Sequence, residues 1–146
     1  MDISKGIELI KRFEGFRANP YKCPANVPTI GYGNTFYEDG TKVTLDDPAI
    51  TEEKGEQLLM KVLTDTFIPG VQRLCPDLEK YPDKFSAILS FAYNLGLGNL
   101  GSSTLRKKIN SEDWVGAKTE IVRWVNAGSK VLKGLIIRRN SERDLL

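Results

Sequence analysis

Apolar side chains recur at spacings of three and four residues near the start of the chain, which predicts a helix over residues 3–13. The positions in this apolar stripe are Ile3, Ile7, Ile10 and Phe13, with Leu9 alongside. Asp2 or Ser4 can cap the first turn, and Gly15 suits the left-handed position that follows a helix end. We therefore expect Glu14 to be the last or next-to-last residue of this helix.

Between residues 18 and 44 the helical pattern gives way to prolines, glycines and short β-prone runs. This composition predicts a small antiparallel sheet with tight turns. Alternation along a strand would place Thr29, Gly31 and Gly33 on one face. Because two of these positions lack a side chain, we expect a ligand to be able to approach the backbone beside Thr29.

The helical pattern returns after a loop at residues 45–50, where Thr51 is expected to cap a helix that Pro69-Gly70 ends or kinks. A strongly apolar helix is predicted over residues 83–95, and residues 94–101 are interpreted as a glycine-rich connection. Shorter helices are predicted to follow over residues 104–109, from Ser111 through Trp124, and over residues 134–146.

These elements predict an α+β fold that is mostly helical and forms a single domain over residues 1–146. We expect a small β-containing lobe at about residues 15–50. The helical lobe would comprise residues 51–146 together with the N-terminal helix. No internal repeat and no linker divides the sequence into independent domains.

Composition excludes several classes of chemistry. The chain has no histidine, which rules out Ser-His-Asp and Cys-His nucleophiles and histidine-containing zinc sites. A formal charge of +2, without a basic patch interleaved with aromatic residues, argues against nucleic acid as the partner. No apolar run reaches the length of a membrane span, and residues 1–5 do not begin a secretory signal, so no stable membrane association is expected.

The two cysteines, Cys23 and Cys75, match no metal-binding spacing. Without an export signal we expect two free thiols, although a disulfide stays open. We expect no metal and no cofactor. Acid–base chemistry would therefore fall to carboxylates, thiols, lysines or tyrosines.

Glu14 is a candidate for acid chemistry because of its place at a helix end. Carbonyl groups crowd a helix C-terminus and disfavour a nearby negative charge, and a general acid needs to hold its proton. Hydrolysis of a glycoside by two groups needs such an acid and a second group that positions water or attacks the sugar. On composition alone, however, Glu14 is one of 19 acidic residues, and a solvated glutamate is the ordinary interpretation.

A resemblance changes that interpretation. The motif consists of Phe13-Glu14-Gly15, Cys23, Thr29 and Ile30-Gly31-Tyr32-Gly33. With this spacing it resembles the active-site signature of the phage-type lysozymes, the endolysins of glycoside hydrolase family 24. Residues 91–98, 103–105 and 109–110 resemble the segments where that family's helices face the cleft, and residues 134–142 resemble its C-terminal helix. The likeness spans nearly the whole chain, and it implies a lysozyme-like fold with an active-site cleft between two lobes.

The resemblance implies a role for each residue of the motif. Glu14 would be the general acid, Thr29 would help to hold the attacking water, and Arg138 or Arg139 would pair with Glu14. Cys23 occupies a position that is aspartate in most members and cysteine in a subset. It could act as a base, orient water or attack the sugar as a nucleophile, or it could be a small filler.

Other positions that match the family cleft are Thr35, Tyr93, Asn94 and Thr104, for which substrate contact and a structural role are both open. Trp114 and Trp124 stand at helical spacing on apolar faces, and we interpret both as core residues.

The function that the resemblance implies is that of a muramidase, which hydrolyses the β-1,4 bond between N-acetylmuramic acid and N-acetylglucosamine in bacterial peptidoglycan. A lytic transglycosylase and a catalytically silent wall-binding module are alternatives. A monomer would collect in the host cytoplasm and depend on a phage holin to reach the wall or periplasm. The sequence does not identify the host or the peptidoglycan chemotype.

Overall fold

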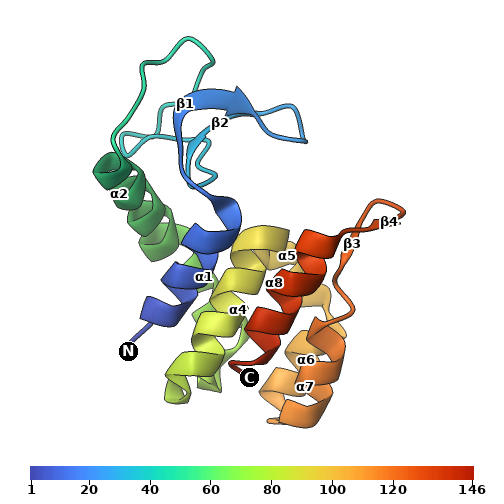
Figure 1. Ribbon diagram of the computed structural model, residues 1–146. Helices are drawn as coiled ribbons and strands as arrows, with labels where there is room; N and C mark the ends of the chain where they lie inside the picture. The colour runs from blue at the N-terminus through green and yellow to red at the C-terminus, as the bar shows by residue number, and fades with distance from the viewer. The chain divides into compact units, whose positions relative to one another are not determined.

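The computed structural model describes all 146 residues, and its chain divides into two compact units (Figure 1). The sheet unit comprises Ile10–Thr66, and the helical unit comprises Met1–Leu9 and Phe67–Leu146. The structure contains helices and short antiparallel sheets, which confirms the predicted α+β class. No helix is long and apolar enough to cross a bilayer.

Helix α1 (Ser4–Glu14) runs from the helical unit into the sheet unit and ends at the predicted residue. Asp2 caps its start, with its carboxylate accepting from the Ser4 N–H at 2.9 Å. Gly15 follows the helix with a φ of 70°, and its N–H donates to the Lys11 carbonyl at 3.0 Å. A glycine adopts this conformation without strain, so it sets the point where Glu14 leaves the helix.

Strands β1 (Arg17–Lys22) and β2 (Pro28–Gly31) form the antiparallel sheet of the sheet unit, with Tyr21 opposite Thr29. The register is irregular between Arg17 and Tyr21. Strand β2 ends at Gly31, because Gly31 and Gly33 have φ angles of 67° and 91°. The alternation of faces that was predicted to continue from Thr29 through Gly33 therefore stops where the strand ends, at Gly31.

Residues 23–27 form the hairpin turn between the two strands, and residues 24–26 are the loop inside its closing pair. The Cys23 N–H donates to the Val27 carbonyl at 3.1 Å, and the Asn26 N–H donates to the Cys23 carbonyl at 2.8 Å. Asn26 has a φ of 64°, a conformation that asparagine tolerates better than most residues. This pattern is a type I turn followed by a left-handed residue, which is a common three-residue hairpin loop. The turn fixes the backbone of Cys23 at its first position.

The sheet unit is closed by α2 (Glu52–Val62), which Thr51 caps as predicted by accepting from the Lys54 N–H at 3.1 Å. Its apolar core includes Ile30, Val43 and Leu58, each at most 3% exposed. The chain then passes through a π-helical turn (Leu63–Phe67) into α3 (Ile68–Leu74). At the predicted break, Pro69-Gly70 lies in the first turn of a new helix. Proline is tolerated there because the N–H groups of a first turn have no partner within the helix.

Helix α4 (Pro82–Leu95) is the buried centre of the helical unit, with α3, α5 and α8 packed against it (Figure 1). The predicted inward residues, Phe85, Ile88, Leu89, Phe91 and Ala92, are all 0% exposed. A 3₁₀-helix (Pro76–Lys80) precedes it.

The remaining helices are α5 (Leu97–Ser102), α6 (Thr104–Asn110), α7 (Trp114–Ile121) and α8 (Lys133–Arg143). Helix α5 replaces the predicted glycine-rich connection, with Gly96 at a φ of 93° marking the break after α4. Asp113, and not Ser111, caps α7 by accepting from the Gly116 N–H at 2.9 Å. A small hairpin, β3 (Asn126–Ala127) and β4 (Lys130–Val131), occupies the loop expected near residue 126.

We expect Gly55→Ala to destabilise the fold, because α2 approaches the aromatic side chains beside the sheet closely. A Cβ at Gly55 would lie 2.7 Å from Phe16 Cε1, and Phe16 packs against Tyr32 with ring centroids 5.5 Å apart. Overpacking of this kind costs about 1–3 kcal/mol. Gly134→Ala is the matched control, since nothing lies within 4 Å of its added Cβ. Urea unfolding should show a loss for the first variant only; equal stabilities would contradict this packing.

Candidate active site

Glu14 ends α1 and is partly exposed, in the sheet unit that also holds Cys23 and Thr29. Its position depends on two features of the local sequence. The apolar stripe of α1 buries Ile10 completely, and Gly15 turns the chain immediately after the carboxylate. Ile10 lies one turn before Glu14 on the same side of the helix, so its burial anchors the turn from which Glu14 projects.

Three neighbouring groups in the hairpin act on the thiol of Cys23. They are the backbone of Val27, the backbone of Ala25 and the side chain of Thr29. These contacts, led by Val27, lower the pKa of Cys23 below its ordinary value, and partial burial opposes them. The hairpin turn thus favours a thiolate at a partly exposed position.

Thr29, one of the groups that act on this thiol, is buried and 3% exposed. Its hydroxyl donates to the Val27 carbonyl at 2.8 Å. Because a hydroxyl has a single proton, it gives that proton either to the Val27 carbonyl or to the sulfur. Thr29 is therefore suited to accept from a neutral thiol and to donate to a thiolate.

Tyr21 and Arg17 lie on the same face of the sheet, although no sequence motif indicated them. Tyr21 pairs with Thr29 across the sheet and precedes Cys23 by two positions, so the three side chains share one face. Arg17 Cζ lies 4.2 Å from the centroid of the Tyr21 ring. The i, i+2 spacing to Cys23 could have indicated Tyr21.

Electrostatics connect this face to Glu14. Burial raises the pKa of Tyr21 above its ordinary value, Arg17 lowers it, and Glu14 and Cys23 raise it further. Glu14 and Cys23 therefore both lie within electrostatic range of the Tyr21 phenol. Thr35 is in the same unit, in the loop after β2, where its carbonyl accepts from the Val43 N–H at 2.9 Å.

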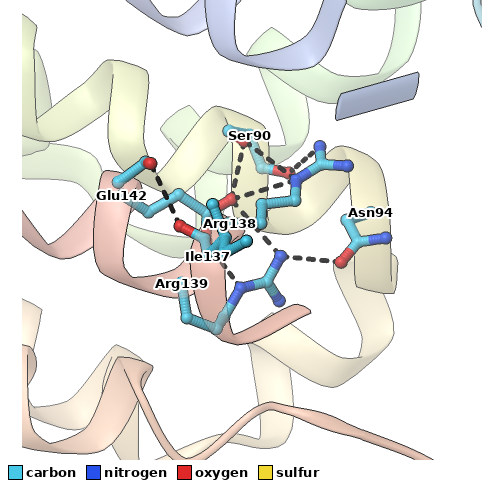
Figure 2. Close-up of polar contacts among 7 residues, drawn as sticks. Ser90, Asn94, Ile137, Arg138, Arg139 and Glu142 are labelled. Carbon is cyan, nitrogen blue, oxygen red and sulfur yellow. Dashed lines mark hydrogen bonds and ion pairs between the residues drawn. The ribbon is translucent and has the colours of Figure 1, made fainter. Parts of the chain in front are cut away.

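The helical unit contains a buried ionic cluster around Glu142, drawn in Figure 2. Its carboxylate pairs with Arg139 Nε at 2.8 Å and Arg138 Nε at 3.4 Å, and accepts from the Ser90 hydroxyl at 2.6 Å. All three charged side chains are at most 4% exposed. Arg138 also donates to the Ser90 carbonyl at 3.1 Å, and Arg139 donates to the Asn94 side chain at 2.6 Å.

Burial raises the pKa of Glu142, against the opposing effect of Arg139, Ser90 and Arg138. Two guanidinium groups share one carboxylate, so the cluster carries a net charge of one positive when Glu142 is ionised. The i, i+4 pairing of Arg138 with Glu142 is buried.

The remaining candidates lie in the helical unit. The Tyr93 ring packs against Phe67 with centroids 5.2 Å apart, and Asn94 holds Arg139. Thr104 lines a pocket of about 420 Å³, whose lining residues are Ser102, Ser103, Thr104, Leu105, Glu120, Arg123 and Trp124. Trp124 is partly buried and packs edge-on against Phe91, as expected of a core residue, but it also faces this pocket.

Known proteins resemble this chain in both sequence and fold. The phage lysozyme family model matches residues 11–142. The chain is 40% identical to the endolysin of Bacillus phage B103 over 99% of its length, but it covers only 54% of that protein. It is 36% identical to the endolysin of Acyrthosiphon pisum secondary endosymbiont phage 1, covering 97% of the chain and 94% of the relative.

Two solved structures resemble the fold over nearly all of both chains. A mutant of P22 lysozyme has a TM-score of 0.83 at 30% identity, covering 97% of this chain and 94% of that one. The muramidase domain of SpmX from Asticaccaulis excentricus has a TM-score of 0.82 at 31% identity, covering 96% and 92%. The lysozyme-like fold predicted from the motif is thereby confirmed.

We expect Glu142→Gln to destabilise the protein strongly, because it leaves two buried guanidinium groups without a counter-charge. Breaking a buried pair by removing one partner costs about 3–5 kcal/mol. Asp65→Asn is the control: it removes an i, i+4 pair with Lys61 at 2.8 Å whose side chains are about half exposed. Such pairs contribute about 0.3–0.5 kcal/mol. Thermal unfolding of both variants measures the difference, and equal losses would contradict the role of burial.

The two free cysteines should differ in reactivity with iodoacetamide. Cys23 is partly exposed and its pKa is lowered, whereas burial raises the pKa of Cys75 to about 11. Because the thiolate is the reactive form, alkylation of Cys23 should proceed with a pH midpoint below that of an ordinary cysteine. Cys75 should stay unlabelled until the protein unfolds. Peptide mass spectrometry across pH measures both rates; faster labelling of Cys75 would contradict the assignment.

Proposed function

Because the chain belongs to the phage lysozyme family, we propose that the protein hydrolyses the β-1,4 bond between N-acetylmuramic acid and N-acetylglucosamine in bacterial peptidoglycan. The observation that carries this proposal is the match of residues 11–142 to the phage lysozyme family model, a span that includes Glu14, Cys23 and Thr29. The names of the relatives support the substrate: one is a muramidase domain and several are endolysins.

In the proposed reaction Glu14 donates its proton to the glycosidic oxygen as the bond breaks. Its place at the end of α1, partly exposed and in the unit that also holds Cys23 and Thr29, supports this role. Water then attacks the sugar from the side that faces the hairpin turn. The products are two shorter glycans. The proton removed from water passes to Cys23 or to solvent, and Glu14 regains its proton from solvent.

Cys23 and Thr29 would hold that water. A carboxylate at position 23 would accept a hydrogen bond from water, and a thiolate can do the same. The groups around Cys23 lower its pKa and so favour the thiolate more than in an ordinary cysteine, and the Thr29 hydroxyl supplies a second contact. We therefore assign Cys23 the role of a base or water-orienting group, in preference to a covalent nucleophile.

An arginine of α8, Arg138 or Arg139, would stabilise the carboxylate that Glu14 becomes after it releases its proton. The net positive charge of the buried cluster supports this proposal. Hydrogen bonds to Ser90 and Asn94 hold both guanidinium groups, so little reorganisation would accompany the reaction.

Tyr93, Asn94, Thr104 and Thr35 remain proposed substrate contacts. The pocket beside Thr104 supports a binding role there, because hydroxyl groups and an indole ring line it together. For Asn94 the hydrogen bond to Arg139 supports a structural contribution as well. We further propose that the protein acts as a monomer and reaches the wall from the cytoplasm through a lesion such as a phage holin makes.

Clearing of purified peptidoglycan tests this function. Glu14→Gln should reduce the rate by roughly 10²–10⁴-fold, because general acid catalysis typically contributes that much. Glu8→Gln makes the same chemical change at an exposed position of the same helix and should leave the rate unchanged. Circular dichroism verifies that both variants are folded. Clearing by Glu14→Gln at the wild-type rate would remove Glu14 from the mechanism.

A further inference from the structure

Arg17 presents an exposed guanidinium group on the face of the sheet that carries Tyr21, Cys23 and Thr29. Gly31, its partner in β2, has no side chain to cover it. The Arg17 side chain is thus fixed from one side by the Tyr21 ring, while its other side faces solvent.

No acidic side chain pairs with Arg17 among the 146 residues of the structure; the Tyr21 ring is its packing partner. Some other arginines do pair with carboxylates: Arg138 and Arg139 with Glu142, and Arg123 with Glu120. Arg12 stacks on the Phe13 ring and, like Arg17, forms no ion pair. A guanidinium stacked on an aromatic ring is held flat and still offers the N–H donors at its edge. That geometry suits a carboxylate, which two parallel N–H groups can bind.

We propose that Arg17, held against Tyr21, binds a carboxylate of the glycan substrate and so favours acidic muramic-acid glycans over neutral ones. This inference rests on the proposed function and extends it to substrate selection. Two sources of the carboxylate share this chemistry: the lactyl group of a muramic acid without its peptide, and the peptide attached to that sugar.

The charges around Tyr21 support this location. Arg17 lowers the pKa of Tyr21, whereas Glu14 and Cys23 raise it, so one positive group lies within electrostatic range of the site's two acidic groups. A substrate carboxylate beside Arg17 would be attracted by the guanidinium and repelled by the Cys23 thiolate. Binding of the carboxylate to Arg17 would therefore set the orientation of the glycan along the sheet face. It would also increase the affinity of the protein for the glycan.

Calorimetric binding tests the proposal in a Glu14→Gln background, where binding is measured whether or not the protein cleaves the glycan. The probes are soluble peptidoglycan fragments with free carboxylates and the same fragments after methyl esterification. Arg17→Gln should raise the Kd for the free-carboxylate fragments by about 10–20-fold, the lower end of what a hydrogen bond to a charged group contributes. It should leave the Kd for the esterified fragments unchanged.

Arg12→Gln is the matched control, because Arg12 is also exposed and also stacks on a ring, with Cζ 4.8 Å from the Phe13 centroid on α1. Arg17→Lys keeps the charge but lacks the planar fork, so it should recover part of the affinity. Fragments stripped of peptide distinguish the two sources: a persisting effect of Arg17→Gln assigns the lactyl group, and a lost effect assigns the peptide. Equal Kd values for Arg17→Gln and Arg12→Gln with every fragment would overturn the proposal.

Discussion

The pairing of β1 with β2 is the constraint on which the candidate site depends. It places Tyr21 opposite Thr29, and the hairpin turn then fixes Cys23 over the backbone of Val27. A slip of one residue would send every side chain of a strand to the other face. The register is protected by the turn itself, in which Asn26 takes the left-handed conformation that the loop needs.

The helical unit supplies the other charged feature, and there the deciding factor is burial. A lone carboxylate in the core of α4 and α8 would be costly, as would two guanidinium groups without a counter-charge. Glu142, Arg138 and Arg139 are stable together because Ser90 and Asn94 satisfy further donors and acceptors around them. Such a network contributes a defined geometry more than it contributes stability, and geometry is what electrostatic catalysis requires.

The sequence was sufficient where local rules coincide with the fold. The apolar stripe of α1 and the glycine after it located the end of that helix correctly, and the apolar run of α4 identified the buried helix. Local rules failed where tertiary packing decides. Residues 97–102 contain two glycines yet form α5, because Leu100 is buried against the rest of the helical unit. Tyr21 was missed because its partners are the residues across the sheet, and strand register is invisible in a single sequence.

Substitution of Cys23 tests the central claim, that the hairpin presents a hydrogen-bonding group to water opposite the general acid. Initial rates on purified peptidoglycan should be similar for the wild type and Cys23→Asp, because a carboxylate can hold the same water. Cys23→Ala should lose most of the activity while its unfolding temperature stays within a few degrees of the wild type. Equal rates for Cys23→Ala and the wild type would contradict the account.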